Sequence, residues 1–187
     1  TRATTPVGLS DVTGMTLDGS TTCAIGDAGL QCWGEGSYLG FADRLTRYLP
    51  EVLTASGITR VERSAARTCT LDDVGTVRCW GSNLAGDTAE TANSPTPIVV
   101  DATDMGPATQ ISTGDDFSCA LDTDGAAWCW GRGRSGSCGN GTFTDYTCPT
   151  PTAVVGGLTF TSLSADAQHV CGITPSQDLY CWGRDDF

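Results

Sequence analysis

Cysteines are the residues of this chain whose types and spacing most clearly imply chemistry. Eight of the ten fall in four copies of one phrase, in which two cysteines nine or ten positions apart are followed by Trp-Gly. The copies occupy residues 23–34, 69–81, 119–131 and 171–183. Turn residues between two short apolar runs indicate a β-hairpin, which places the two cysteines on facing strands. We therefore predict one disulfide per copy: Cys23–Cys32, Cys69–Cys79, Cys119–Cys129 and Cys171–Cys181.

The remaining two cysteines, Cys138 and Cys148, lie in the long segment after the third Trp-Gly and are predicted to staple that loop. Zinc is the competing interpretation, but zinc sites favour close Cys-x-x-Cys spacing, often with several histidines. The chain has neither, since His169 is its only histidine. An even number of cysteines, all paired locally, indicates an oxidising compartment. We expect the protein to be secreted or on the cell surface, and a periplasmic location fits the same argument.

Few other residues form a pattern typical of a catalytic or metal-binding site. A catalytic His169 needs a nucleophile or a carboxylate fixed beside it, and we expect a hydrogen-bonded structural residue instead. The run from Asp122 to Gly125 resembles the start of a calcium loop, but position 12 of such a loop is Gly133 rather than Glu. A hairpin turn is the favoured interpretation. Without a Ser-His-Asp set, a phosphate loop or a paired-carboxylate motif, the sequence predicts no enzyme, no metal and no cofactor.

The elements that position these residues recur with a long period. The tryptophans of the four phrases lie 47, 50 and 52 residues apart, at Trp33, Trp80, Trp130 and Trp182. A period near 50 is typical of a propeller or solenoid. Before each first cysteine lies a short alternating stretch, expected to be an inner strand, and before that a proline begins an outer or edge strand. The tryptophans are expected to pack blade against blade.

Four short antiparallel strands in each repeat predict an all-β fold, a β-propeller of four-stranded blades with four repeats in this chain. We treat residues 1–187 as a single array, with approximate repeats 6–49, 50–94, 95–148 and 149–187. The chain starts on an outer strand near Pro6, and the last repeat stops after Gly183 without one. The first strand would complete the last blade and close a ring, or the same ends would complete a neighbouring molecule. Self-association through the end strands is therefore one expected partnership, because unpaired strand edges must be covered.

The net charge of the chain limits the other classes of partner that we expect. The chain has 22 acidic and ten basic residues, and its net charge is −12. Such a surface repels phosphate backbones, so we expect no nucleic-acid binding. The sequence has no apolar run long enough to cross a bilayer, so we expect no membrane insertion.

The repeat resembles that of the regulator-of-chromosome-condensation family of β-propellers. The segments that carry the resemblance are Ser118-Cys119-Ala120-Leu121, Gln168-His169-Val170-Cys171, Cys129-Trp130-Gly131 and Tyr38-Leu39-Gly40. The resemblance covers nearly all of the chain and implies a propeller, which in this family usually has seven blades. Members with paired cysteines look like secreted or surface bacterial proteins. The eukaryotic namesake is an exchange factor for a small GTPase that also binds chromatin, and no residues here match its exchange wedge.

These observations predict a non-catalytic extracellular or surface β-propeller that serves as a protein–protein interaction or assembly module, with a structural role. One alternative is a secreted enzyme inhibitor, similar to the propeller-type β-lactamase inhibitor protein. Another is a calcium- or glycan-binding module, suggested by the acidic turns. Trp128 has no counterpart in the other repeats, and Phe143 and Tyr146 lie in the long third loop. These three aromatic residues are the candidate partner contacts.

Overall fold

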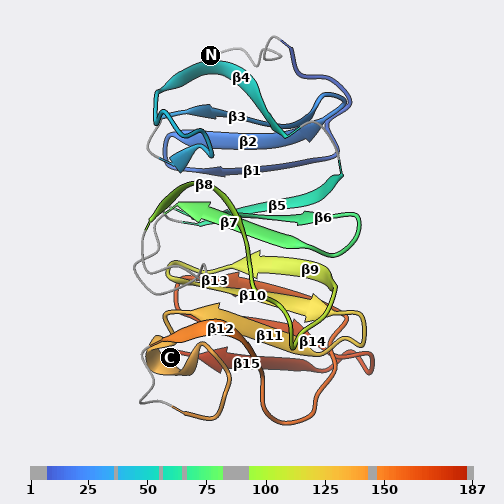
Figure 1. Cartoon of the computed structure of the whole chain (residues 1–187). Helices are drawn as coiled ribbons and strands as arrows, with labels where there is room; N and C mark the ends of the chain where they lie inside the picture. The colour runs from blue at the N-terminus through green and yellow to red at the C-terminus, as the bar shows by residue number, and fades with distance from the viewer. Residues whose placement is uncertain are drawn as a thin grey trace, which may run out of the picture.

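The computed structural model of the chain describes residues 8–35, 38–54, 57–64, 67–81, 93–142 and 147–184. These residues form four antiparallel sheets that follow one another from blade one, at the top of Figure 1, to blade four at the bottom. Blade one consists of β1 (Gly14–Asp18), β2 (Thr21–Gly26), β3 (Gly29–Gly34) and β4 (Arg47–Thr54). Blade two consists of β5 (Ile58–Ser64), β6 (Arg67–Asp72), β7 (Val77–Gly81) and β8 (Ser94–Val99).

Blades three and four complete the array. Blade three consists of β9 (Ala108–Thr113), β10 (Phe117–Asp122), β11 (Ala127–Gly131) and β12 (Cys148–Ala153), with the short 3-10 turn η2 (Arg134–Gly136) before β12. Blade four consists of β13 (Ser162–Asp166), β14 (His169–Ile173) and β15 (Leu179–Gly183). Within each blade every strand pairs with the next along the chain, so the predicted all-β propeller architecture is confirmed.

The outer strands that open the second, third and fourth sequence repeats belong to the preceding blades. The strand β4, which contains Pro50, pairs with β3 of blade one, and β12, which contains Pro151, pairs with β11 of blade three. Each blade therefore begins with its inner strand, out of phase with repeat boundaries drawn at the prolines. Blade four has only three strands among the described residues, so the outer edge of β15 has no partner strand there.

The backbone conformation after each of the four tryptophans requires a glycine. The glycine that ends each third strand has a φ of 110° to 114°, in the region that residues with a Cβ rarely adopt. A Cβ on Gly34 would lie 1.9 Å from the carbonyl oxygen of Ser20. The register with the outer strand also shifts at this point, between Cys32 and Gly34 in blade one. The same bend recurs in all four blades, which explains why glycine follows every one of these tryptophans.

The five predicted disulfides are confirmed. The four hairpin pairs face each other in register, and their Cα atoms are 4.1 Å apart. Cys138 and Cys148 join the loop after η2 to the start of β12, with Cα atoms 6.5 Å apart. The described residues include no free cysteine.

The hairpin disulfides of blades one to three each pack against the inner strand of the following blade. Val61 of β5 lies in a buried cluster with the blade-one pair Cys23 and Cys32. Ile111 of β9 does the same with the blade-two cysteines, and Leu163 of β13 with the blade-three cysteines. The tryptophans lie on the opposite faces of their sheets and pack toward the preceding blade, so Trp80 joins the blade-one cluster and Trp130 the blade-two cluster. The core is thus a series of interfaces between blades.

Polar contacts also join the blades. Arg67 is 2% exposed, and its Nη2 donates to the carbonyl oxygens of Gly114 (3.1 Å) and Phe117 in blade three. Burial lowers the pKa of Arg67 to about 10, although Asp116 and Asp115 oppose that shift. Gln110 of β9 reaches Leu163 of β13, donating to its carbonyl oxygen (2.8 Å) and accepting from its N–H (3.0 Å). The side chains therefore fix the spacing of neighbouring inner strands.

Candidate protein-interaction surface

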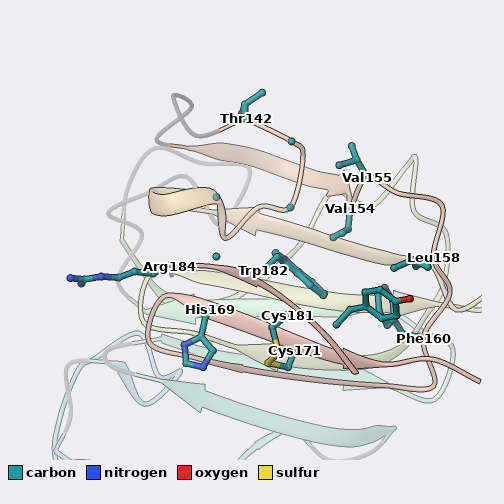
Figure 2. A pocket seen from close by; sticks show the side chains of 15 residues that line it. Thr142, Val154, Val155, Leu158, Phe160, His169, Cys171, Cys181, Trp182 and Arg184 are labelled. Carbon is teal, nitrogen blue, oxygen red and sulfur yellow. A yellow bond between two sulfur atoms is a disulfide. The ribbon is translucent and has the colours of Figure 1, made fainter. Parts of the chain in front are cut away.

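A hollow of about 700 Å³ borders the outer edge of β15, where the other blades carry a fourth strand. Figure 2 shows it from close by, with Val154 and Val155 on one side and Trp182 and Phe160 on the other. We call it the blade-four pocket. Its lining is glycine, aliphatic and aromatic for the most part, and the described lining residues include no Asp, Glu, Ser or Lys. Such a lining suits contact with an apolar or extended polypeptide segment better than acid–base chemistry.

The wall of the pocket repeats a packing unit seen between blades one and two. A Cβ on Gly40 would lie 2.4 Å from Leu53 and 3.1 Å from Nε1 of Trp80, so glycine is needed where the loop crosses the tryptophan. In the third loop Gly139 has the same role: a Cβ there would lie 2.9 Å from Val154 and 3.0 Å from Nε1 of Trp182. Trp182 is therefore held as Trp80 is, and each tryptophan borders a hollow. Trp182 lines the blade-four pocket, and Trp80 lines a second hollow of about 630 Å³ with Leu53 and with Pro97 of β8.

Phe160 closes the other side of the Trp182 ring. The two ring centroids are 5.7 Å apart and the planes are inclined by 41°. Phe160 is 4% exposed and belongs to the core cluster between blades three and four, so it gives the pocket a rigid floor. A rigid aromatic surface loses little conformational entropy when a partner covers it.

The open face of blade four exposes groups that the other blades bury. The cysteines of the first three hairpin disulfides are 0% exposed, whereas Cys171 is half-buried and Cys181 is exposed. Leu179 and Ile173, on the same side of the sheet, are 66% and 40% exposed. This end face carries an apolar surface of the kind that blades one to three place against the next inner strand.

The opposite end of the array is also apolar. On β1, Met15 and Leu17 are 67% and 65% exposed, and they point to the same side of the sheet because strand side chains alternate. Trp33 is half-buried on that face, in contrast with the buried Trp80 and Trp130. Both ends of the array therefore present apolar surface to solvent.

The residues singled out from the sequence are placed as follows. Trp128 is half-buried against the blade-two cluster, and its Nε1 donates to Oδ2 of Asp122 at 2.8 Å. Phe143 and Tyr146 lie outside the described residues. His169 is half-buried on β14 at the margin of the blade-four pocket. The pocket brings His169 and Trp182 together, whereas Trp128 lies on another part of the molecule.

The acidic segments at Asp122 and Asp72 form hairpin turns, as the sequence predicts for Asp122. Oδ1 of Asp122 accepts the N–H groups of Asp124 and Ala126, both at 2.9 Å. Oδ1 of Asp72 likewise accepts the N–H groups of Val74 and Thr76, and its Oδ2 accepts from Arg78 at 2.7 Å. Both carboxylates therefore accept hydrogen bonds from groups of their own hairpins. Among the described residues, no group of three or more His, Cys, Asp or Glu side chains is placed to hold a metal ion.

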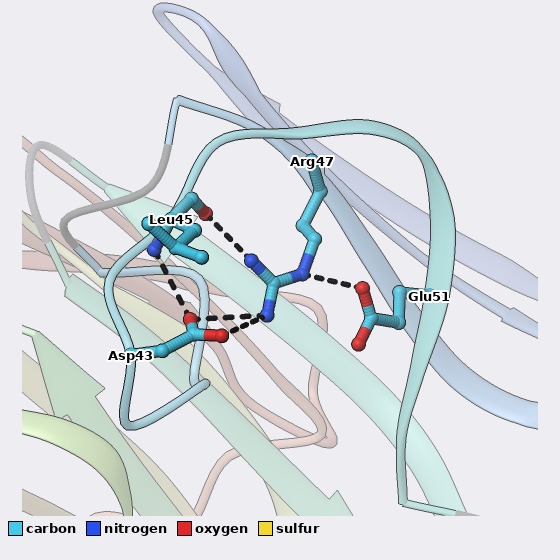
Figure 3. A network of polar contacts seen from close by, with 4 residues as sticks. All are labelled: Asp43, Leu45, Arg47 and Glu51. Atoms are coloured by element: carbon cyan, nitrogen blue, oxygen red, sulfur yellow. Dashed lines mark hydrogen bonds and ion pairs between the residues drawn. The ribbon is translucent and has the colours of Figure 1, made fainter.

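A second polar network holds the loop before β4 (Figure 3). Arg47 donates to both carboxylate oxygens of Asp43 (2.8 and 3.0 Å) and to the carbonyl oxygen of Leu45 (3.1 Å), and it also pairs with Glu51. Its guanidinium lies 4.5 Å from the centroid of the Phe41 ring. The hydrogen bonds from Arg47 hold the pKa of Asp43 below its usual value. Sequence reasoning missed this network, because the i, i+4 spacing of Asp43, Arg47 and Glu51 indicates paired side chains only on a helix, and the segment is a loop and a strand.

The fold and the end faces together define the class: an array of β-propeller blades whose outermost faces are open. Residues 108–140 match the model of the regulator of chromosome condensation (RCC1) repeat. A sequence comparison with curated proteins finds no match. Among the described residues no helix is long and apolar enough to cross a membrane.

Solved structures agree on the fold. Yeast RCC1 (Prp20), in its complex with Kap60, superposes with a TM-score of 0.79 at 18% identity, over 92% of this chain and 43% of that one. Human WBSCR16 gives a TM-score of 0.79 at 15% identity, over 92% and 47% of the two chains. The ectodomain of the Physcomitrella patens receptor kinase CR4 gives 0.63 at 25% identity, over 96% and 43%. The chain therefore spans a little under half the length of each of these three structures.

Proposed function

We propose that the protein is an extracellular, non-catalytic interaction module that binds an extended polypeptide segment along the outer edge of β15. The observation that carries the proposal is the blade-four pocket, which lies where the blade would hold its fourth strand. An exposed strand edge offers a row of backbone N–H and C=O groups, and adding a strand to such an edge is a recurrent mode of peptide recognition. The side-chain pockets beside the edge then supply specificity.

Three further observations support the location and the class. Five disulfides suit an oxidising environment. The ectodomain of a plant receptor kinase is among the matching structures. Yeast RCC1, another match, was solved bound to the protein Kap60. A protein partner is thus the expected ligand, and the described lining of the pocket lacks the paired carboxylates or the nucleophile that catalysis needs.

The test uses a peptide with the sequence of residues 93–100, which contains the outer strand of blade two. The chain is diluted until light scattering gives the mass of one chain, 19.4 kDa. Saturable binding should slow amide hydrogen exchange across Leu179–Gly183. The control is the same peptide N-methylated at Thr96, Ile98 and Val100, which keeps the side chains but removes strand hydrogen bonds, since Pro95 and Pro97 carry no N–H. Equal protection by both peptides, or protection by neither, would contradict the proposal.

A further inference from the structure

The inner strand of blade one carries a packing residue that has no blade to pack against. Met15 pairs with Ala24, the residue after the first cysteine of its blade. The residues at the same register position in the other blades are Val61, Ile111 and Leu163. These three are 5%, 2% and 4% exposed, because each lies against the disulfide of the preceding blade, whereas Met15 is 67% exposed. The surface around Met15 is therefore shaped to cover a hairpin disulfide.

One hairpin disulfide lacks such a cover. Cys171–Cys181 faces away from blade three, on the side where blades one to three receive the next inner strand. The chain thus contains the two halves of one more blade-to-blade interface. Blade one and blade four lie at opposite ends of the molecule, so these halves do not meet within it (Figure 1).

The segment before β1 has the sequence of an outer strand. Pro6 lies nine positions before Met15, and Pro50 lies eleven positions before Val61, which has the same register position. The segment also enters its blade in the same way. The carbonyl oxygen of Ser10 accepts from the N–H of Asp27 in the β2–β3 turn (3.1 Å), as that of Gly57 accepts from Asp73 in the β6–β7 turn (2.8 Å). Residues 1–7 lie outside the described residues, and the sequence before Ser10 shares with β4 a proline followed by apolar residues.

We propose that the partner of the blade-four edge is a second copy of this chain, docked head to tail. Its β1 face, with Met15 and Leu17, covers Cys171–Cys181, and its residues 3–9 add to β15 as the fourth strand. This inference rests on the proposed function, because it names the segment that the β15 edge binds. The reciprocal contact closes two copies into a ring of eight blades, within the range of roughly four to eight found in propellers. A heterologous contact closes in this way when its rotation completes a circle.

The test is the solution mass of the 187-residue chain, measured by light scattering without reductant at increasing concentration. The expected particle has twice 19.4 kDa. Met15→Asp should return it to the mass of one chain, with association weakened by roughly 100-fold or more, because it would bury an unpaired carboxylate. Met15→Val, which carries the residue of blade two, should still pair. Val74→Asp, at a position 71% exposed in the β6–β7 turn, is the matched control for adding a charge elsewhere.

The outcomes separate this inference from the proposed function. A single-chain mass at every concentration, or pairing that survives Met15→Asp, overturns the second copy as the partner. An open series of higher masses overturns the closed ring. The peptide of residues 93–100, added to Met15→Asp, reports on the β15 edge alone. If it slows exchange across Leu179–Gly183 while the wild-type chain stays single, the strand-binding edge stands and the second copy does not.

Discussion

Replacing both cysteines of a hairpin by alanine should destabilise blade three more than blade four. Cys119–Cys129 and Cys171–Cys181 each join residues separated by 10 positions. The chain-entropy loss on removing either disulfide is therefore the same, about 2.7 kcal/mol at 25 °C. The surroundings differ, because both cysteines of blade three are 0% exposed and Cys181 is exposed.

Burial adds a second cost in blade three only. Removing one buried atom about the size of a methyl group from a packed core costs about 1 kcal/mol. The double alanine variant of blade three loses two such atoms, against the neighbouring Leu163 and Phe117. Its free energy of unfolding should fall by about 5 kcal/mol, and that of the blade-four variant by about 3 kcal/mol.

The measurement is equilibrium urea unfolding without reductant, followed by circular dichroism. Both variants are made in the Met15→Asp background, so that no second copy covers blade four. The parent for each difference is Met15→Asp alone. Equal losses, or a larger loss in blade four, would refute the idea that the blade-four disulfide lies on an open face.

Three further predictions concern polar groups. Arg67→Leu removes the donor to the Gly114 and Phe117 carbonyls. It should lower the free energy of unfolding, measured in urea, by about 3 kcal/mol and speed hydrogen exchange at the start of β10. An unchanged midpoint of urea unfolding would contradict this prediction. Burial raises the pKa of Glu62 above 4.5, and the charge of Arg60 opposes that shift. The native state therefore binds more protons than the unfolded state just above pH 4.5, so the free energy of unfolding falls there as pH rises. Glu62→Gln should therefore raise the melting temperature at pH 7 and lose that advantage below pH 4.5; a pH-independent difference would exclude this cause. Arg47→Ala should raise the pKa of Asp43 toward 3.8 in a carboxyl NMR titration, and Arg44→Ala is the matched control.

The repeated parts of the fold were predictable because their signals are local. A turn between two cysteines indicates a hairpin, and four copies in phase make the disulfide pairing and the blade architecture readable from the sequence alone. The hydrogen bond between Asp122 and Trp128 could also have been predicted from the sequence. Asp72 and Arg78 have the same spacing of six residues across their hairpin, which would have identified Trp128 as a partner of its own turn.

Contacts between blades were not predictable in the same way. Arg67 meets Gly114 and Phe117 across 47 and 50 residues of sequence, and no motif marks that arginine. Its position in the hairpin corresponds to His169 in blade four and Thr21 in blade one, so side-chain type varies while geometry persists. The blade-four pocket also depends on packing, since Phe160 and Trp182 come together only when neighbouring strands are placed in space.

The composition of the end faces is the strongest reason to expect that they are covered. Repeat arrays that end in solvent usually carry polar residues on their outer faces. Here the reverse holds at Leu17, which pairs with Thr22, the residue before the first cysteine. At the same register position the other three blades carry Arg63, Thr113 and Ala165, whereas blade one, whose face is exposed, carries leucine at 65% exposure. A chain with a net charge of −12 has acidic side chains in plenty, yet Met15, Leu17, Leu179 and Cys181 keep both ends apolar. Apolar ends on an otherwise acidic array are the expected composition of two surfaces that are buried against each other.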